Sequence, residues 1–466
     1  MYTLKQIENL NKDIEQFPQV YPITPDMKIT RSGVSRLVML DRYSFKDTEK
    51  KTLKEGDIVV LTIKQDPKFP ARGIGIIKEL NWDKNEATVF IFDDYVNALE
   101  DSKEMETQLI TRSIDVIDKP LELFYEQIAK RNARGLSEVE DEDKRQEVFE
   151  MFYDVLKNEN LVPAGRVLYG AGSGQNVTYF NCYVMPFPKD SREGLSEHRG
   201  KVMEIMSRGG GVGTNGSTLR PKHALARGVN GKSSGAVSWL NDIAQLTHLV
   251  EQGGSRRGAQ MIMLAVWHPD IIEFIISKMQ NPRILRYLIE NTNDEQIKQL
   301  AKEKLKFTPF TEEQRKIYEL ALTNPNISNE DRKKIENKLA TGGEYSVHNP
   351  DFLTGANISV ALTKEFMDAV DNDDYFELKF PDVENYNEEQ MKYYNENWHH
   401  VGDVREWENE HNMPVKVYRK IKARDLWSLI NICATYSAEP GIFFIDNANE
   451  MTNAKAYGQK VVATNP

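Results

Sequence analysis

The stretch EQGGSRRGAQMIMLAVWHPDI, residues 251–271, decides the fold class of this chain. Within it, MIMLAVW at 261–267 is a short apolar run after a glycine cluster, which predicts a buried strand. From Leu161 onward the chain repeats this composition, because short apolar runs, glycine clusters and helical patterns alternate. Such alternation is typical of a parallel α/β sheet, so we expect residues 161–466 to form the main domain.

The chain before this domain divides into three parts. Residues 1–30 are polar and proline-bearing, which predicts an irregular lead-in. Residues 31–104 contain GDIVVLTIK and ATVFIFDDYV, and we expect a small β-rich domain there. Residues 105–160 show charged sequence with apolar residues at helical spacing, which predicts a helical connector. Within the main domain, a charged helical insertion at about 278–343 interrupts the pattern, and we expect it to be solvated.

Composition excludes several classes of protein. No run approaches the roughly 18 apolar residues of a membrane span, and the first residues lack the basic start and apolar stretch of a signal peptide, so we expect a cytoplasmic protein without a membrane partner. The net charge of -11 disfavours direct nucleic-acid binding. Two cysteines, Cys182 and Cys433, argue against a disulfide framework, and we expect no metal site in this chain.

The segment GVGTNG, residues 211–216, matches the glycine spacing of dinucleotide-binding loops. That fingerprint follows a strand and opens a helix, whereas here KVMEIMSRG before it is helical and Pro221 follows it closely. We therefore reject a dinucleotide site. The glycines are better explained by a close backbone approach or positive φ where a helix ends and a strand begins, or by tight packing alone.

A second glycine cluster surrounds two adjacent arginines, Arg256 and Arg257. Flanking glycines predict a mobile loop, and paired guanidinium groups can reach phosphate or base groups. A solvent-facing arginine pair is the alternative explanation.

Several segments together resemble the vitamin B12-dependent (class II) ribonucleotide reductases. They occur in the family's order: SRLVMLDRY, VPAGRVLYGAG, YFNCYVMP, RGGGVGTNGSTLRP, VNGKSSGAVSW, QGGSRRGA, WHPDI, NISVALT, AEPGIFFID and a terminal TNP. The resemblance implies the first half of a ten-stranded α/β barrel, preceded by the β-rich domain and helical connector, and leading to a finger loop with the motif Asn-Pro-Cys-Gly-Glu. Asn465 and Pro466 match its first two residues. We expect the N-terminal portion of a reductase, from a split or intein-interrupted gene; arbitrary truncation is the alternative.

The resemblance also implies residue roles. Cys182 resembles the redox cysteine that reduces C2′ of the ribose, and Asn465 resembles the asparagine that orients the ribose hydroxyls. Cys433 lies in an amphipathic helical pattern and is interpreted as core. Five residues are expected to bind substrate: Ala164, Gly165, Arg166, Asn181 and Gly211. Six are expected in the effector and specificity segments: Arg227, Gly253, Gly254, Ser255, Arg256 and Arg257.

By this resemblance the complete enzyme uses adenosylcobalamin to form a thiyl radical and reduces ribonucleotides, with diphosphates preferred over triphosphates. The residues that bind cobalamin cannot be identified from this sequence. Implied partners are the C-terminal half of the reductase, a ribonucleotide, a dNTP or ATP effector and a thioredoxin-type reductant, with a homodimer left open. Two other classes compete: a non-catalytic nucleotide-binding fragment and, more weakly, a glycyl-radical type of enzyme.

Overall fold

The computed structural model describes residues 4–66, 70–226, 231–252 and 256–466. The chain divides into two compact units, and the boundary between them falls between Asn181 and Cys182. Each unit has its own apolar core.

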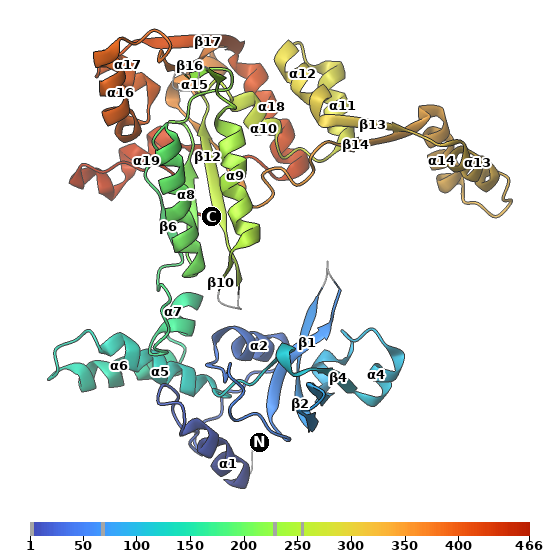
Figure 1. Ribbon diagram of the computed structural model, residues 1–466, viewed down its shortest axis with the longest axis vertical. Coiled ribbons are helices and arrows are strands. Elements are labelled where there is room, and N and C mark those ends of the chain that lie inside the picture. Colours follow the sequence, from blue (N-terminus) through green and yellow to red (C-terminus); the bar gives the residue numbers. More distant parts are fainter. Residues whose placement is uncertain (1–3, 67–69, 227–230, 253–255) are drawn as a thin grey trace. The chain divides into compact units, whose positions relative to one another are not determined.

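The first unit contains a five-stranded antiparallel sheet in the order β4-β3-β2-β1-β5 (Figure 1). Its strands are β1 (Ile58–Lys64), β2 (Ala71–Asn81), β3 (Glu86–Ile91), β4 (Leu109–Ser113) and β5 (Ile117–Asp118). Val59, Val60 and Leu61 on β1 are fully buried. The interpretation of residues 105–118 as helical connector is wrong for β4 and β5, since these short strands of mixed polarity carry too little alternation to reveal themselves in sequence.

Several helices complete the first unit. They are α1 (Leu4–Ile14), α2 (Gly33–Val38), α3 (Asp93–Val96), α4 (Ser102–Thr107), α5 (Tyr125–Ser137), α6 (Arg145–Lys157) and α7 (Gly165–Gly170), with a π-helical turn η1 at Met39–Tyr43 and a 3-10 turn η2 at Ile114–Val116. The lead-in predicted to be irregular contains α1. The physical reason is the helical spacing of Ile7, Leu10 and Ile14, which direct α1 toward the core of this unit.

The second unit is built on a five-stranded sheet in the order β18-β15-β12-β7-β6. Its strands are β6 (Cys182–Val184), β7 (Gly211–Asn215), β12 (Gln260–Ala265), β15 (Asn357–Leu362) and β18 (Gly441–Phe444), and all four pairings are parallel. The predicted parallel α/β arrangement is confirmed. That this sheet forms half of a ten-stranded barrel stays a prediction.

The glycine cluster before β7 is a helix-to-strand connection. Helix α8 (Arg192–Ser207) ends just before it, and Gly209 has φ +91, a conformation that favours glycine. The segment Gly211–Asn215 is strand β7 itself and follows helix α8, so it is not a turn from a strand into a helix, which the dinucleotide fingerprint requires.

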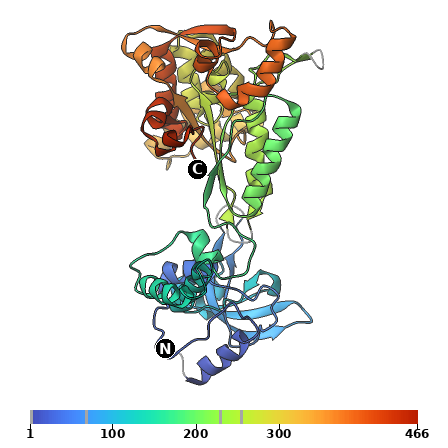
Figure 2. The ribbon, with the colours of Figure 1, turned by 90° about the vertical axis from the view of Figure 1, so that its left-hand side faces the viewer.

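Further helices pack around the parallel sheet. They are α9 (Ala236–Leu249), α10 (Ile271–Ile276), α15 (Lys364–Asp371), α16 (Glu388–Val401), α17 (Val404–Asn409), α18 (Ala423–Ser437) and α19 (Ile445–Met451), with a 3-10 turn η4 at Asn453–Tyr457. Helices α8 and α9 lie side by side, against β7 and β12 (Figure 2). Cys433 on α18 is buried, and this burial raises the pKa of its thiol to about 12. Its interpretation as a core residue is confirmed.

Short two-stranded ribbons complete the second unit. They are β8–β9 (Leu225–Ala226 with Gly231–Lys232), β10–β11 (Glu251–Gln252 with Arg256–Arg257), β13–β14 (Leu305–Pro309 with Gly343–Val347) and β16–β17 (Tyr375–Pro381 with Val415–Lys422).

The insertion has two parts with different surroundings. Helices α11 (Pro282–Asn291) and α12 (Glu295–Lys304) place Leu285, Leu288 and Ile297 in the main core, so the expectation of a wholly solvated insertion is wrong for them. The ribbon β13–β14 then carries α13 (Glu312–Leu322) and α14 (Asn329–Thr341) outward as an arm (Figure 1). Neither of these two helices has a buried residue.

Candidate active site

Cys182 lies at the start of the edge strand β6, beside the end of the chain. Its Cα pairs with Gly211 on β7, and its Sγ lies 3.7 Å from the carbonyl oxygen of Pro466. A Cβ added to Gly211 would lie 2.9 Å from Cγ of Pro466 and 3.3 Å from the Cys182 sulfur. The absence of a side chain at Gly211 therefore lets the half-buried thiol and the terminal segment meet.

The terminal segment 461–466 is held against the sheet by side chains. Asn449 on α19 accepts from the backbone N–H of Val461 at 2.7 Å and donates to its carbonyl at 3.2 Å. Asn215, at the end of β7, donates to the carbonyl of Val462 at 2.8 Å. The N–H of Thr464 points to the sulfur of Met263 at 3.2 Å. The segment thus runs from the carboxyl ends of the strands back to Cys182.

Close packing supports the same path. Ala463 is 2% exposed and packs with Met263 and Ala361 on the face of the sheet. A Cβ on Gly213 would lie only 1.9 Å from the carbonyl oxygen of Thr464. Asn465 follows at this point and is exposed.

A cavity of about 520 Å³ opens at the carboxyl ends of the strands, in the same unit. Asn215, Ala265 and Ala361 line it from β7, β12 and β15. Its lining also includes Gly458–Val462, where Lys460 forms an ion pair with Glu406. Part of the lining belongs to the segment that leads to Pro466. A molecule bound in this cavity would therefore contact that segment.

His198 on α8 packs behind β7. Its side chain is 4% exposed, and Nε2 lies 3.0 Å from the hydroxyl of Thr214. Burial, assisted by Lys201, lowers the pKa of His198 to about 4. A neutral imidazole therefore supports β7 from the side opposite the terminal segment.

We expect acid to weaken the second unit through His198. The unfolded histidine binds a proton near pH 6.5 and the folded one near 4, so this contribution is complete above pH 6.5 and is lost as pH falls toward 4. The loss amounts to about 3 kcal/mol. In urea titrations from pH 7 to 4, His198→Gln should show a smaller fall in the free energy of unfolding than the wild type. The exposed His348 gives the control, since His348→Gln should keep the wild-type slope; equal slopes in all three would contradict the prediction.

The predicted substrate residues fall in both units. Ala164 and Gly165 open α7 in the first unit, where Arg166 is 8% exposed, and Asn181 is an exposed residue at the end of that unit. Gly211 lies in the second unit, against Cys182. The structure therefore brings Cys182, Gly211 and the Asn465–Pro466 segment together, and the substrate roles of all these residues stay predictions.

The predicted effector residues are only partly described. Arg227, Gly253, Gly254 and Ser255 lie outside the described residues. Arg256 and Arg257 form strand β11, whose Cα partners on β10 are Gln252 and Glu251. Their part in effector recognition stays a prediction.

Sequence reasoning missed the residues that hold the terminal segment, which are Asn215, Met263 and Asn449. Asn215 stood within the quoted GVGTNG motif, and this motif was the available signal. Asn449 belongs to no motif, and its bonds to Val461 appear only in the fold.

Within the described ranges, no group of three or more His, Cys, Asp or Glu side chains is placed to hold a metal ion. None of the helices in that same part of the chain has both the length and the apolar character needed to cross a membrane.

Residues 180–466, most of the chain, match the family described as ribonucleotide reductase, barrel domain, and residues 115–176 match ribonucleotide reductase, all-alpha domain. The chain therefore belongs to the ribonucleotide reductase large-subunit family. The first match begins just before Cys182 and contains the whole parallel sheet.

Individual relatives agree with this assignment. The chain is 27% identical over 317 residues to a vitamin B12-dependent ribonucleoside-diphosphate reductase of Thermoplasma acidophilum, across 68% of this chain and 28% of that protein. It is 31% identical over 159 residues to the protein of that name in Mycobacterium tuberculosis strain H37Rv, across 34% and 22%. With the ribonucleoside-diphosphate reductase large chain of Cryptosporidium parvum it shares 31% identity over 124 residues, across 26% and 15%. The chain spans less than a third of each relative.

Proposed function

We propose that the whole protein containing this chain reduces ribonucleoside diphosphates to deoxyribonucleotides. The observation that carries the proposal is the meeting of Cys182 with the Thr464–Pro466 segment on the sheet of a ribonucleotide reductase barrel domain. The names of the relatives support the diphosphate substrate and a vitamin B12 cofactor.

In this proposal Cys182 supplies reducing equivalents. A radical at C3′ of the ribose allows the 2′-hydroxyl to leave as water once it is protonated, and two thiols then give up two electrons and become a disulfide. Cys182 is one of these thiols. Cys433, the other cysteine of the sequence, is buried with a raised pKa and is unsuited to be the second. We therefore propose that the second thiol and the radical thiol come from a C-terminal half of the reductase.

Asn465 has the chemistry for orienting the ribose. Its amide offers a donor and an acceptor without adding charge. The exposed side chain follows directly on the backbone that Gly213 and Met263 hold in place. In the proposal it binds the ribose hydroxyls while the backbone of Ala164 and Gly165 and the side chain of Arg166 contribute to substrate binding.

Adenosylcobalamin is proposed as the radical source on the strength of the relatives' names. A corrin carries cobalt on its own ring nitrogens, so it does not require a cluster of protein ligands. No described residue is assigned to holding the corrin ring.

The experiment is a turnover assay on this chain combined with the C-terminal half of the reductase. With a ribonucleoside diphosphate, adenosylcobalamin and a dithiol, we expect deoxyribonucleoside diphosphate to form, and no product when cobalamin is omitted. If the complete protein binds nucleotide but forms no deoxyribonucleotide under these conditions, the non-catalytic binding fragment becomes the better account.

Regulation is proposed on resemblance alone. Arg256 and Arg257 on β11 would relay the identity of a bound dNTP or ATP to the substrate, and a thioredoxin-type reductant would recycle the disulfide. A change in substrate preference with different dNTPs, lost on replacing both arginines, would support this assignment.

A further inference from the structure

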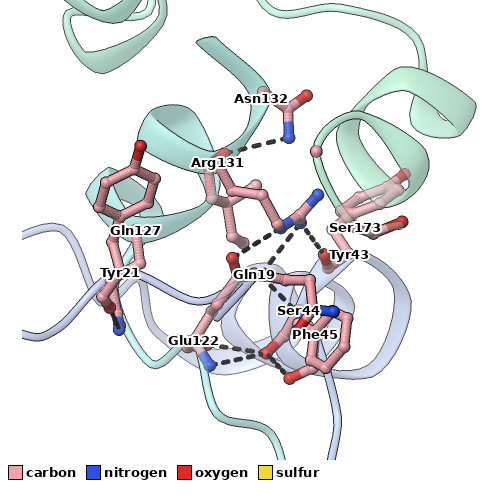
Figure 3. A network of polar contacts seen from close by, with 12 residues as sticks. Gln19, Tyr21, Tyr43, Ser44, Phe45, Glu122, Gln127, Arg131, Asn132 and Ser173 are labelled. Carbon is pink, nitrogen blue, oxygen red and sulfur yellow. Dashed lines mark hydrogen bonds and ion pairs between the residues drawn. The ribbon is translucent and has the colours of Figure 1, made fainter. Parts of the chain in front are cut away.

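Arg131 and Glu122 form a fully buried ion pair in the first unit. Both side chains are 0% exposed. The Arg131 Nε donates to one carboxylate oxygen at 2.7 Å and Nη2 donates to the other at 3.0 Å, in the two-pronged geometry that Figure 3 shows. The pair lies in the described part of the helical region, where sequence reasoning predicted only a connector.

The remaining donors of Arg131 cap helix α7. Nη1 donates to the carbonyls of Ala171 at 2.7 Å and Tyr169 at 3.2 Å, and Nη2 donates to that of Leu168 at 3.0 Å. The last carbonyls of a helix have no partner within the helix and attract positive charge. One guanidinium therefore satisfies two of the last carbonyls of this six-residue helix and the carbonyl of its C-cap residue, while the Gly170 carbonyl accepts from the hydroxyl of Ser173 at 2.8 Å.

Close backbone packing fixes the same end. A Cβ on Gly135 would lie 2.1 Å from the backbone nitrogen of Gly172, and one on Gly172, which has φ +70, would lie 2.3 Å from the carbonyl oxygen of Arg131. Arg134 also donates to the carbonyl of Gly172 at 2.9 Å. Helix α7 is thus docked on α5 with little freedom to slide.

Arg131 reaches the other end of α7 through Tyr43. Its Nη2 donates to the Tyr43 carbonyl at 3.0 Å, while the Tyr43 ring would lie 3.1 Å from a Cβ on Gly165. Glu122 in turn accepts from the N–H of Phe45 at 2.8 Å. The ion pair therefore holds both the cap of α7 and the chain that packs under the turn at Ala164–Arg166.

Stability alone does not account for this arrangement. Buried ion pairs are often no more stabilising than apolar side chains of the same volume, because both charges must leave water. An apolar pair, however, would leave the carbonyls of Tyr43, Leu168 and Ala171 without these donors. What the charged pair provides is a fixed geometry.

We infer that Arg131, locked by Glu122, is the positioning residue of the Ala164–Arg166 turn, and that it sets how this turn meets the ribonucleotide. The second half of this inference rests on the proposed function. The first half, the fixing of the turn, does not.

The test compares Arg131→Lys and the double variant Arg131→Met/Glu122→Leu with the wild type. Lysine keeps a positive charge beside Glu122, so the protein should still fold, but it cannot make the bidentate contact of the guanidinium. We expect amide hydrogen exchange at residues 164–172 to quicken at least about tenfold, with exchange in β1 and β2 unchanged. In the complete reductase, KM for the ribonucleotide should rise about tenfold, with a smaller change in kcat.

The matched control is Arg112→Met/Glu104→Leu. This pair is also bidentate and lies in the first unit, but it joins β4 to α4. It should alter neither the exchange at 164–172 nor KM. Wild-type exchange at 164–172 in both Arg131 variants would overturn the inference. A complete protein that makes no deoxyribonucleotide would instead overturn the proposed function, and the exchange measurement would still decide whether Arg131 holds the turn.

Discussion

Cys182→Ser should abolish multiple turnover in the complete reductase. A hydroxyl cannot form the disulfide that releases two electrons to the substrate, so we expect steady-state deoxyribonucleotide formation to fall by more than about a hundredfold. Ribonucleotide affinity should stay near that of the wild type, because Cys182 provides electrons rather than binding energy. Steady-state product formation and equilibrium nucleotide binding, measured on the same preparation, separate the two effects.

The chain supplies its own control for this experiment. Cys433→Ser also removes a thiol, but from the buried core around α18, so it should cost stability and leave turnover per folded molecule intact. Full turnover by Cys182→Ser would remove Cys182 from the reductant role and would leave the proposed chemistry without a thiol from this chain.

Gly213→Ala is expected to have the second largest effect. The added methyl group would lie 1.9 Å from the Thr464 carbonyl oxygen, which is backbone and cannot rotate away. Because overpacking of this kind costs about 1–3 kcal/mol, the segment should leave the sheet rather than compress. We expect the Cys182 thiol to be alkylated faster, since Pro466 no longer lies against it, and turnover of the complete reductase to fall at least about tenfold.

Gly200→Ala is the matched control for that variant. Gly200 lies within α8, and nothing lies within 4 Å of the position that its Cβ would take. Alanine there should stabilise the helix by up to about 1 kcal/mol and leave Cys182 reactivity unchanged. If Gly213→Ala behaves like Gly200→Ala in both assays, the terminal segment is not held by close contact with β7.

Local sequence patterns predicted much of this fold and part of its candidate site. The apolar run around Met263 predicted a buried strand in a parallel sheet, and β12 is one. The resemblance pointed to both Cys182 and Pro466, which the structure places beside each other. The bonds of Asn449 and Asn215 to the terminal segment join residues far apart in the sequence, so no local motif predicted them, although Asn215 itself lies in the GVGTNG segment.

The burial of charged residues was also not predicted from the sequence. Arg131 and Glu122 stand in a stretch whose polar residues look like the wet face of an amphipathic helix. Their burial depends on the tertiary fold, which brings the carbonyls of Tyr43 and of α7 within hydrogen-bonding distance of Arg131. Similarly, α11 and α12 read as solvated because their few apolar residues are outnumbered by charges, yet those few enter the main core.

The ribbon at the base of the outward arm makes that arm a separable module. Leu305 and Val347 are paired across β13 and β14, so the chain leaves the second unit and returns to it at one point. Residues 306–346 can therefore be exchanged for a short turn, or extended with a reporter protein, without pulling the two anchoring ends apart. Changes in the length of the arm can be absorbed at this one point, because neither the parallel sheet nor the residues that hold the terminal segment belong to it.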